Sequence, residues 1–260
     1  MKTARRLARR VSRAEMRLFL AEGPQAVREA LGRPGCVAEI FAVPGADTAH
    51  REIYHLSRDG GIAWQPVDEA ALASLAETVH PQGLVAVCRF LDRPLADILS
   101  TRHQLLALCA DVRDPGNAGT VLRCADAAGA DAAVLTGSSV DPYNGKVVRA
   151  SAGSLFHLPL AISPETADVV TAVQKKGITV LAADGAGEVD LDDAIDAGLL
   201  AGPTAWLFGN EAWGLPEELT GLADHRVAIP IHGRAESLNL ATAAAVCLYA
   251  SARAQRRRPS

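Results

Sequence analysis

The sequence lacks the features that mark membrane, secreted and zinc-binding proteins. No apolar run reaches the ~18 residues expected of a membrane span, and the basic segment 1–17 lacks the apolar core and cleavage site of a secretory signal. The five cysteines are scattered and form no C-x-x-C pair, which favours reduced cytosolic thiols. We therefore expect a cytoplasmic protein with no membrane segment and no metal.

Several catalytic and nucleotide-binding motifs are also missing. The chain contains no G-x-G-x-x-G, no H-E-x-x-H and no G-x-S-x-G, which argues against a Rossmann dinucleotide site, a zinc protease and an α/β-hydrolase. Gly145-Lys146 lacks both the spacing and the following Ser or Thr of a P-loop. A nucleotide-dependent oxidoreductase and an NTPase therefore have little support.

What is present indicates an α/β protein of two parts. The 260 residues are 49% apolar and 22% charged, enough for one large or two modest domains with full cores. Short strands alternate with helices over residues 24–91, and a second series has strands that are apolar at consecutive positions, as buried parallel strands are. We predict an N-terminal domain at 1–92 with a basic extension at 1–20, a linker at 93–103 and a second domain at 104–260.

The charge distribution is uneven. Residues 1–20 carry seven basic residues and one acidic residue, residues 253–260 carry four arginines, and the remainder carries 15 basic and 29 acidic residues. Two basic ends around an acidic body are compatible with contacts to a phosphate backbone. Solvated, partly disordered tails explain the charge pattern equally well.

Loops that follow parallel strands are where ligands bind in such sheets, and three of them carry polar residues. In the first, residues 111–131, Asn117 can cap a helix and Arg123 follows six residues later. This spacing is a little under two turns, so we expect both side chains to project roughly from one side. A capped helix with Arg123 paired to an acid is the alternative.

The second loop, residues 207–215, follows a strand that we expect to be buried, and it contains two glycines and a carboxylate, Glu211. Glycines let backbone approach a ligand, although an ordinary strand-to-helix turn is the alternative. The third, residues 229–240, places Ser237 and Asn239 before a long apolar helix. Free amides at a helix start can bind polar acceptors, and simple capping is again the alternative.

Together the three loops resemble the motifs of the SpoU (TrmH-like) RNA ribose 2′-O-methyltransferases of the SPOUT class. Three stretches match in order and separation: Asn-x-Gly-x-x-x-Arg, then Gly-x-Glu-x-x-Gly, then Pro-Ile-x-Gly-x-x-x-Ser-Leu-Asn. They begin at Asn117, Gly209 and Pro230. The N-terminal part resembles the family's L30-like substrate-binding domain, so the resemblance covers nearly the whole chain.

This resemblance implies a fold, a cofactor and partners. The fold is a C-terminal parallel-sheet α/β domain with a trefoil knot, one of the rare exceptions to unknotted chains, plus the smaller L30-like α/β domain. The implied cofactor is S-adenosylmethionine, cupped by loops 207–214 and 229–240, and because the family is typically homodimeric we expect a homodimer. The implied methyl acceptor is a ribose 2′-hydroxyl in RNA, with 23S ribosomal RNA preferred to transfer RNA. A non-catalytic RNA-binding assembly factor is the alternative from another class.

The resemblance also implies the site residues, because each position of the family's motifs matches a residue of this sequence. The catalytic candidates are Asn117, Arg123, Glu211, Ser237 and Asn239. The cofactor-binding candidates are Leu207, Gly209, Asn210, Gly214, Ile229, Ile231, Ser237 and Leu238. The RNA-binding candidates are Arg5, Arg6, Arg9, Arg10 and Arg149, with a surface salt bridge as the alternative for Arg149.

Two roles for Arg123 are compatible with the resemblance. In the family its counterpart is proposed to accept the proton of the ribose hydroxyl. A guanidinium rarely gives up its proton below pH ~12, so a charged Arg123 that grips a phosphate and stabilises the developing alkoxide fits as well.

Overall fold

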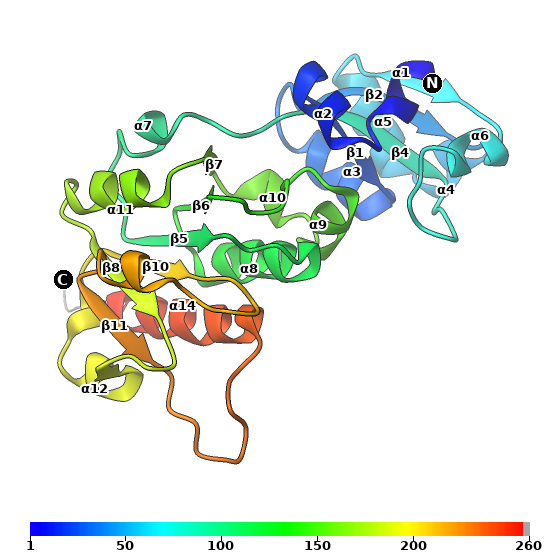
Figure 1. The fold of residues 1–260 in the computed structure, drawn as a ribbon. Coiled ribbons are helices and arrows are strands. Elements are labelled where there is room, and N and C mark those ends of the chain that lie inside the picture. The colour runs from blue at the N-terminus through cyan, green and yellow to red at the C-terminus, as the bar shows by residue number, and fades with distance from the viewer. Residues whose placement is uncertain (257–260) are drawn as a thin grey trace. The chain divides into compact units, whose positions relative to one another are not determined.

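The computed structural model describes residues 1–256, so the arginines at 257 and 258 of the basic C-terminal tail lie outside the described residues. The chain forms two compact units (Figure 1), of which the first contains Met1–Leu91 and Asp141–His157. The second contains Asp92–Val140 and the chain from Leu158 onward. Residues 141–157, which the predicted boundary assigns to the second domain, therefore cluster with the first unit. The predicted linker 93–103 contains a short helix.

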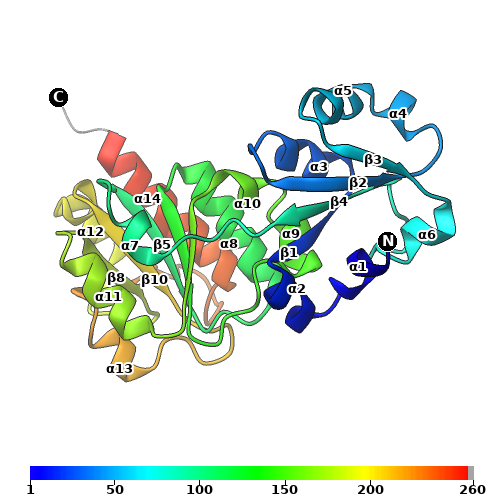
Figure 2. The same ribbon diagram turned by 90° about the horizontal axis from the view of Figure 1, so that it is seen from above.

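The first unit is built on a four-stranded sheet (Figure 2) in the order β1-β4-β2-β3. β4 is antiparallel to β1 and β2, whereas β3 is parallel to β2. Its strands are β1 (Leu18–Glu22), β2 (Val37–Ala42), β3 (Ala63–Pro66) and β4 (Leu84–Arg89). Its helices are α1 (Lys2–Arg6), α2 (Arg10–Met16), α3 (Pro24–Leu31), α4 (Ala46–Ala49), α5 (Arg51–Asp59), α6 (Glu69–Ala73), α9 (Gly145–Ala150) and α10 (Ser154–His157).

The basic N-terminal extension is folded. Ala4 and Leu7 are buried beside the β-sheet, so α1 and α2 are packed helices and not a solvated tail. Arg13 is buried as well, and its guanidinium holds Asp141 at 2.7 Å and donates to the carbonyls of Leu7 and Ala8. A buried charge is tolerated only when it is paired in this way.

Aromatic packing explains why residues 141–157 belong to the first unit. The ring of Tyr143 stacks on Phe90 at 3.8 Å between centroids and lies 4.8 Å from Phe19. The Tyr143 hydroxyl accepts a hydrogen bond from the Leu91 amide at 2.7 Å. The buried ring thus has its polar end satisfied, as buried tyrosines usually do.

The second unit contains a seven-stranded sheet in the order β7-β6-β5-β10-β8-β11-β9, with every pairing parallel. Its strands are β5 (Leu105–Ala110), β6 (Ala132–Thr136), β7 (Leu160–Ser163), β8 (Thr179–Ala183), β9 (Val189–Asp190), β10 (Thr204–Phe208) and β11 (His225–Ala228). Its helices are α7 (Leu95–Ile98), α8 (Pro115–Ala128), α11 (Thr166–Gln174), α12 (Leu191–Asp196), the 3-10 turn η1 (Leu199–Ala201), α13 (Glu217–Thr220) and α14 (Leu240–Arg256).

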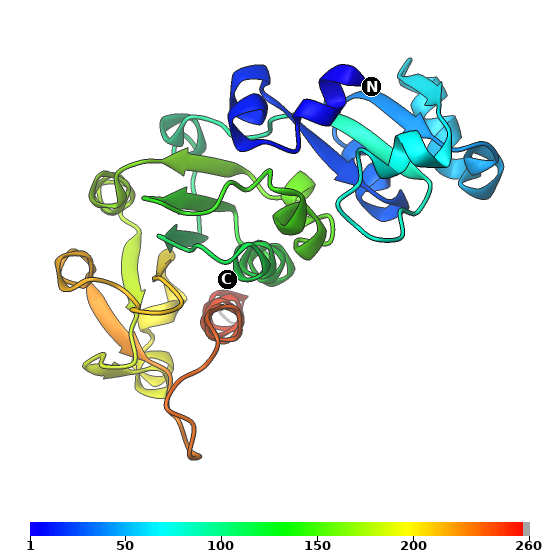
Figure 3. The same cartoon turned by 45° about the vertical axis from the view of Figure 1, so that its right-hand side comes forward.

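Both faces of this sheet are covered, which is why its central strands are apolar at every position. On one face, Leu106, Leu108 and Leu207 pack with residues of α7 and α11. On the other face α8 and α14 lie side by side (Figure 3), and Trp206 of β10 donates to Ser251 of α14 at 2.8 Å. The predicted parallel α/β fold is confirmed, and the trefoil knot stays a prediction.

Candidate active site

Neighbouring strands bring the first two predicted loops together. β5 and β10 are parallel partners, with Cys109 opposite Phe208, so the loops that follow them leave the same edge of the sheet. The loop after β5 leads into α8, whose first turn carries Asn117, and the loop after β10 carries Glu211. Asn117 and Glu211 are about ninety residues apart in the sequence, but the strand order brings them together in space.

The carboxylate of Glu211 joins these two loops. One oxygen accepts from the Arg113 amide at 3.2 Å, and the other accepts from the Asp114 amide at 3.0 Å and from the side-chain amide of Asn117 at 3.4 Å. Glu211 thus satisfies backbone donors just before α8, where a helix start leaves amides without partners.

Asn117 and Asn239 complete a chain of hydrogen bonds across all three loops. The Asn239 side chain donates to the Asn117 side-chain oxygen at 3.1 Å, and Asn117 donates onward to Glu211. Asn239 also accepts from the amides of Ala241 and Thr242 at the start of α14, so it both caps the helix and orients Asn117.

The cap of α8 differs from the expectation. Asp114 is the N-cap, and its side chain accepts from the backbone amide of Asn117 at 2.8 Å. Pro115 occupies the first helical position, where its missing amide costs nothing. Asn117 therefore lies inside the first turn of α8, and its side chain is available for the contacts with Glu211 and Asn239.

A tight turn holds Glu211 in place. Asn210 and Gly214 exchange two backbone hydrogen bonds of 2.9 Å, which close a three-residue loop. The side chain of Asn210 fixes the turn from both sides, because it accepts from Ala212 and donates to the carbonyl of Asp111. A Cβ on Gly209 would lie 2.4 Å from the carbonyl carbon of Gly214, so only glycine fits at this position.

A cavity of about 330 Å³ lies beside this turn, at the carboxyl ends of β8, β10 and β11. Its size is within the range of about 300–1,000 Å³ that is usual for small-molecule sites. Its lining is mainly apolar with a few polar groups, and includes Asp184, Gly185, Phe208, Gly209, Asn210, Glu211, Gly214, Ile229, Ile231, Glu236, Ser237, Leu238 and Leu240.

Seven of the eight predicted cofactor residues line this cavity, and Leu207 does not. Its side chain is buried in the core on the face that packs with α11. Because side chains alternate along a strand, the next residue, Phe208, faces the cavity instead. Leu207 is thus the one predicted cofactor residue that does not line the cavity, and its contact with the cofactor stays a prediction.

Arg123 takes no part in the hydrogen bonds that join Asn117, Glu211 and Asn239. It is exposed on α8, and it is not among the described residues that line the cavity. Six residues along a helix correspond to a rotation of about 120° away from Asn117. The two side chains therefore leave the helix in different directions, and the expectation of a shared side is wrong.

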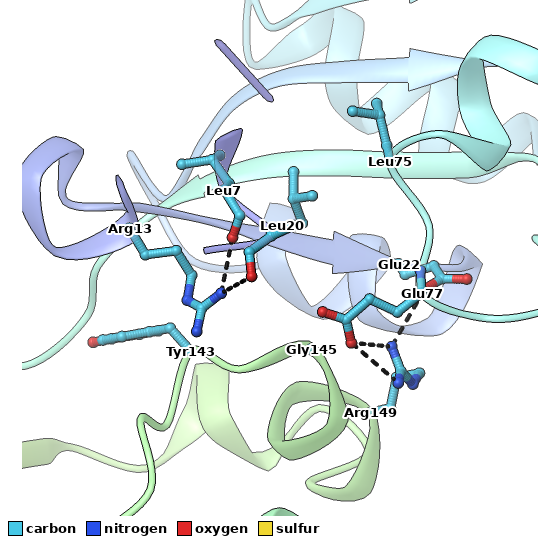
Figure 4. A pocket seen from close by; sticks show the side chains of 10 residues that line it. Leu7, Arg13, Leu20, Glu22, Leu75, Glu77, Tyr143, Gly145 and Arg149 are labelled. Atoms are coloured by element: carbon cyan, nitrogen blue, oxygen red, sulfur yellow. Dashed lines mark hydrogen bonds and ion pairs between the residues drawn. The ribbon is translucent and has the colours of Figure 1, made fainter. Parts of the chain in front are cut away.

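The predicted RNA-binding arginines are distributed over the first unit. Arg5 donates to Ser74, Arg6 lies 3.9 Å from Glu15, and Arg9 and Arg10 are exposed at the start of α2. Arg149 forms salt bridges of 3.4 Å with Glu22 and with Glu77, and dashed lines in Figure 4 mark these contacts. Its salt bridges match the alternative given for this residue, and its role as an RNA contact stays a prediction.

The cysteines near the sheet are poor nucleophiles. Burial, together with the negative charge of Glu211, raises the pKa of Cys109 to about 12, and burial raises that of Cys247 to about 12. A thiol rather than a thiolate is present at neutral pH, and thiolate is the reactive form. Within residues 1–256, no cluster of His, Cys, Asp or Glu is arranged to hold a metal, and no helix is long and apolar enough to cross a membrane.

Sequence reasoning missed Asp184, Arg113 and the capping role of Asp114. Asp184 follows β8, which pairs with β10, but the motifs do not include this loop. Arg113 and Asp114 lie in the short loop between β5 and α8, so their position after a strand end is the signal that could have indicated them.

The fold and the site define a parallel α/β protein with a small-molecule cavity at the carboxyl edge of its sheet. Residues 104–249 match the SpoU rRNA Methylase family, and residues 20–94 match the RNA 2'-O ribose methyltransferase substrate-binding family. The chain belongs to the SpoU rRNA methylase family.

Relatives match over nearly the full length. The chain is 33% identical to the 23S rRNA (guanosine(2553)-2'-O)-methyltransferase RlmP of Bacillus subtilis, over 96% of this chain and 94% of the relative. The crystal structure of an AdoMet-bound rRNA methyltransferase from Sinorhizobium meliloti has a TM-score of 0.83 at 33% identity, and covers 97% of this chain and 93% of that one. The SpoU methyltransferase AviRb from Streptomyces viridochromogenes, in complex with AdoMet, has a TM-score of 0.84 at 29% identity, with 97% and 96% covered.

Proposed function

We propose that this protein transfers the methyl group of S-adenosylmethionine to the 2′-hydroxyl of a ribose in 23S ribosomal RNA. The observation that carries this proposal is the hydrogen-bonded chain of Asn239, Asn117 and Glu211 beside a cavity lined by both apolar and polar side chains. The names of the relatives support a ribosomal rather than a transfer RNA substrate. A ribosomal RNA substrate also supports a location in the cytoplasm.

The cavity suits the cofactor. Apolar side chains such as Ile229, Ile231 and Leu238 provide surfaces for the adenine and ribose carbons, and Ser237 and Glu236 offer oxygens for polar groups. The cofactor supplies a sulfonium-bound methyl group. Gly209 lets the turn close against Gly214, and both glycines line the cavity with backbone alone, which allows a ligand to approach closely.

The polar cluster positions the acceptor. Orientation of the attacking oxygen relative to the methyl carbon can account for a large part of the rate. Asn117 has its amide fixed by Asn239 and Glu211, and Ser237 is exposed at the cavity wall. These neutral groups hold the ribose and its 2′-oxygen without competing for the methyl group.

Arg123 completes the site from a second copy of the chain. A homodimer with two-fold symmetry can supply the same residue to each partner's cavity, and an exposed Arg123 that does not line its own chain's cavity suits this arrangement. There Arg123 either takes the hydroxyl proton or, as a cation, grips the adjacent phosphate and stabilises the alkoxide. Both roles require Arg123 for turnover.

The first unit binds the RNA. Exposed Arg5, Arg6, Arg9 and Arg10 lie on or between α1 and α2, so they offer a fixed basic surface to the phosphate backbone. For single-stranded RNA, each phosphate that the protein neutralises should steepen the fall of log affinity with log salt concentration by about 0.7. The target nucleotide is read in a looped or unpaired segment, where its ribose is accessible.

Transfer of a labelled methyl group tests the proposal. Purified protein and methyl-labelled S-adenosylmethionine are incubated with unmodified 23S rRNA transcript or with tRNA transcripts from the same organism. We expect label in one 2′-O-methylated nucleotide of the 23S transcript, and loss of that methylation in a deletion strain. Label in tRNA alone would overturn the choice of substrate. Cofactor binding without label in any RNA would favour the assembly factor.

A further inference from the structure

Trp213 is an exposed aromatic side chain on the turn that holds Glu211. Of the three tryptophans in the chain, Trp206 is fully buried, whereas Trp213 is 54% exposed. It is not among the described residues that line the cofactor cavity, although Ala212 and Gly214 on either side of it are. Trp213 therefore lies at the rim of the site and outside the cofactor cavity.

Arg113 covers part of this indole. Its guanidinium carbon lies 5.0 Å from the centroid of the Trp213 ring, which is within the range of a cation–π contact. The backbone amide of the same Arg113 donates to Glu211. One residue thus connects the anchored carboxylate to the exposed ring, and the Arg113–Trp213 pair is held at a fixed place beside Asn117.

The turn itself is rigid enough to present the ring. Glu211 and Trp213 both belong to the three-residue loop that the Asn210–Gly214 bonds close. The hydrogen bonds of Asn210 to both sides of the turn restrict it further. A fixed turn that keeps this ring 54% exposed leaves aromatic surface free to bind a ligand, and burial of that surface favours binding.

We propose that the Arg113–Trp213 pair stacks a nucleobase of the RNA substrate next to the ribose that is methylated. Single-stranded RNA bases stack on aromatic and guanidinium planes, and the pair offers one of each. Its cation also suits the phosphate that accompanies the base. This inference rests on the proposed function, and it adds the residues that hold the acceptor nucleotide in register with the cluster of Asn117, Glu211 and Asn239.

The test compares Trp213→Ala, Trp213→Phe and Arg113→Ala with the wild type, and uses Ile195→Ala, an exposed apolar residue on α12, as the matched control. Methyl transfer to the 23S transcript gives KM and kcat, calorimetry gives S-adenosylmethionine affinity, and sedimentation gives the oligomeric state. One stacked base is worth about 1–3 kcal/mol by alanine substitution, which is about 5- to 150-fold.

We expect Trp213→Ala to raise the KM for the transcript by about 5- to 150-fold, with cofactor affinity changed by less than about twofold. Trp213→Phe should restore most of this loss, and Ile195→Ala should match the wild type. Arg113→Ala should raise KM less, because it keeps the indole. Part of the tryptophan fluorescence of the wild type comes from Trp213 and is absent in Trp213→Phe. Addition of the transcript should quench this part.

Three results would overturn the inference. Unchanged KM in Trp213→Ala shows that no base stacks there. Lost cofactor affinity assigns the ring to the cofactor site, and altered sedimentation with parallel loss of activity assigns it to contact with a second copy. A wild-type protein that methylates no RNA contradicts the proposed function instead, so the two failures are distinguishable.

Discussion

Replacing Glu211 with glutamine tests whether its carboxylate ties the first two loops together. The carboxylate accepts from the amides of Arg113 and Asp114 and from the side chain of Asn117. Glutamine has the same shape, but it keeps only one acceptor oxygen and turns a donor toward one of these amides. A hydrogen bond to a charged group contributes about 1.5–3 kcal/mol, and the exposure of Glu211 reduces this.

We therefore expect Glu211→Gln to lower the free energy of unfolding of the second unit by roughly 1–2 kcal/mol, and its Tm by about 2–8 °C. Methyl transfer should fall by about 10²-fold, because a displacement of about 1 Å at the acceptor has that effect. Calorimetric unfolding and labelled methyl transfer measure the two quantities.

The matched control is Glu165→Gln, an exposed carboxylate before α11 whose side chain does not cap that helix. It should leave both quantities unchanged. If Glu211→Gln behaves like this control in stability and in rate, the carboxylate does not anchor the site and the reasoning is refuted.

Three further predictions concern the turn, the dimer and the buried thiol. Gly209→Ala should abolish cofactor binding in calorimetry, since a Cβ would lie 2.4 Å from backbone of Gly214; retained affinity would show that the turn adapts. Arg123→Ala and Gly209→Ala should each be inactive alone. If each site takes Arg123 from the partner, mixing the two variants should restore about one quarter of wild-type activity, because about half of the dimers are mixed and each has one intact site. No recovery would place Arg123 in its own chain's site. The pKa of Cys109 is raised from 9.0 to about 12, so as pH rises the unfolded chain loses this proton before the folded chain does. Between pH 9 and 12 the free energy of unfolding of the wild type should therefore fall more steeply than that of Cys109→Ala, by up to about 1.4 kcal/mol per pH unit. Equal slopes in denaturant titrations at these pH values would show that burial does not shift the pKa of this thiol.

The sequence predicted the parallel sheet because its strands are apolar on consecutive residues. β5, β6 and β10 are buried at every position, and this pattern is visible without coordinates. β1 was not expected, because only Phe19 and Ala21 of its residues are buried. Its pairing with β4, more than sixty residues away, has no local signal.

The candidate site was predictable to the extent that its residues follow strands. Asn117, Glu211 and Asn239 meet because β5 and β10 are neighbours and α14 returns beside α8. The loop positions indicated where to look, but not that Asn239 would orient Asn117 or that Asp114 would cap α8. Those contacts depend on side-chain direction, which spacing along the chain does not determine. The spacing between Asn117 and Arg123, in contrast, already corresponds to a rotation of about 120°, so a shared side could have been excluded from the sequence.

The most direct test of the proposed active site is a crystal structure of the protein with S-adenosylhomocysteine, the product that the methyl donor leaves. We expect the ligand in the cavity between Gly209 and Leu238, its sulfur directed toward Asn117 and Glu211 of the same chain, and Arg123 of a second copy at the same opening. Ligand bound elsewhere, or a sulfur directed away from Asn117, would contradict it.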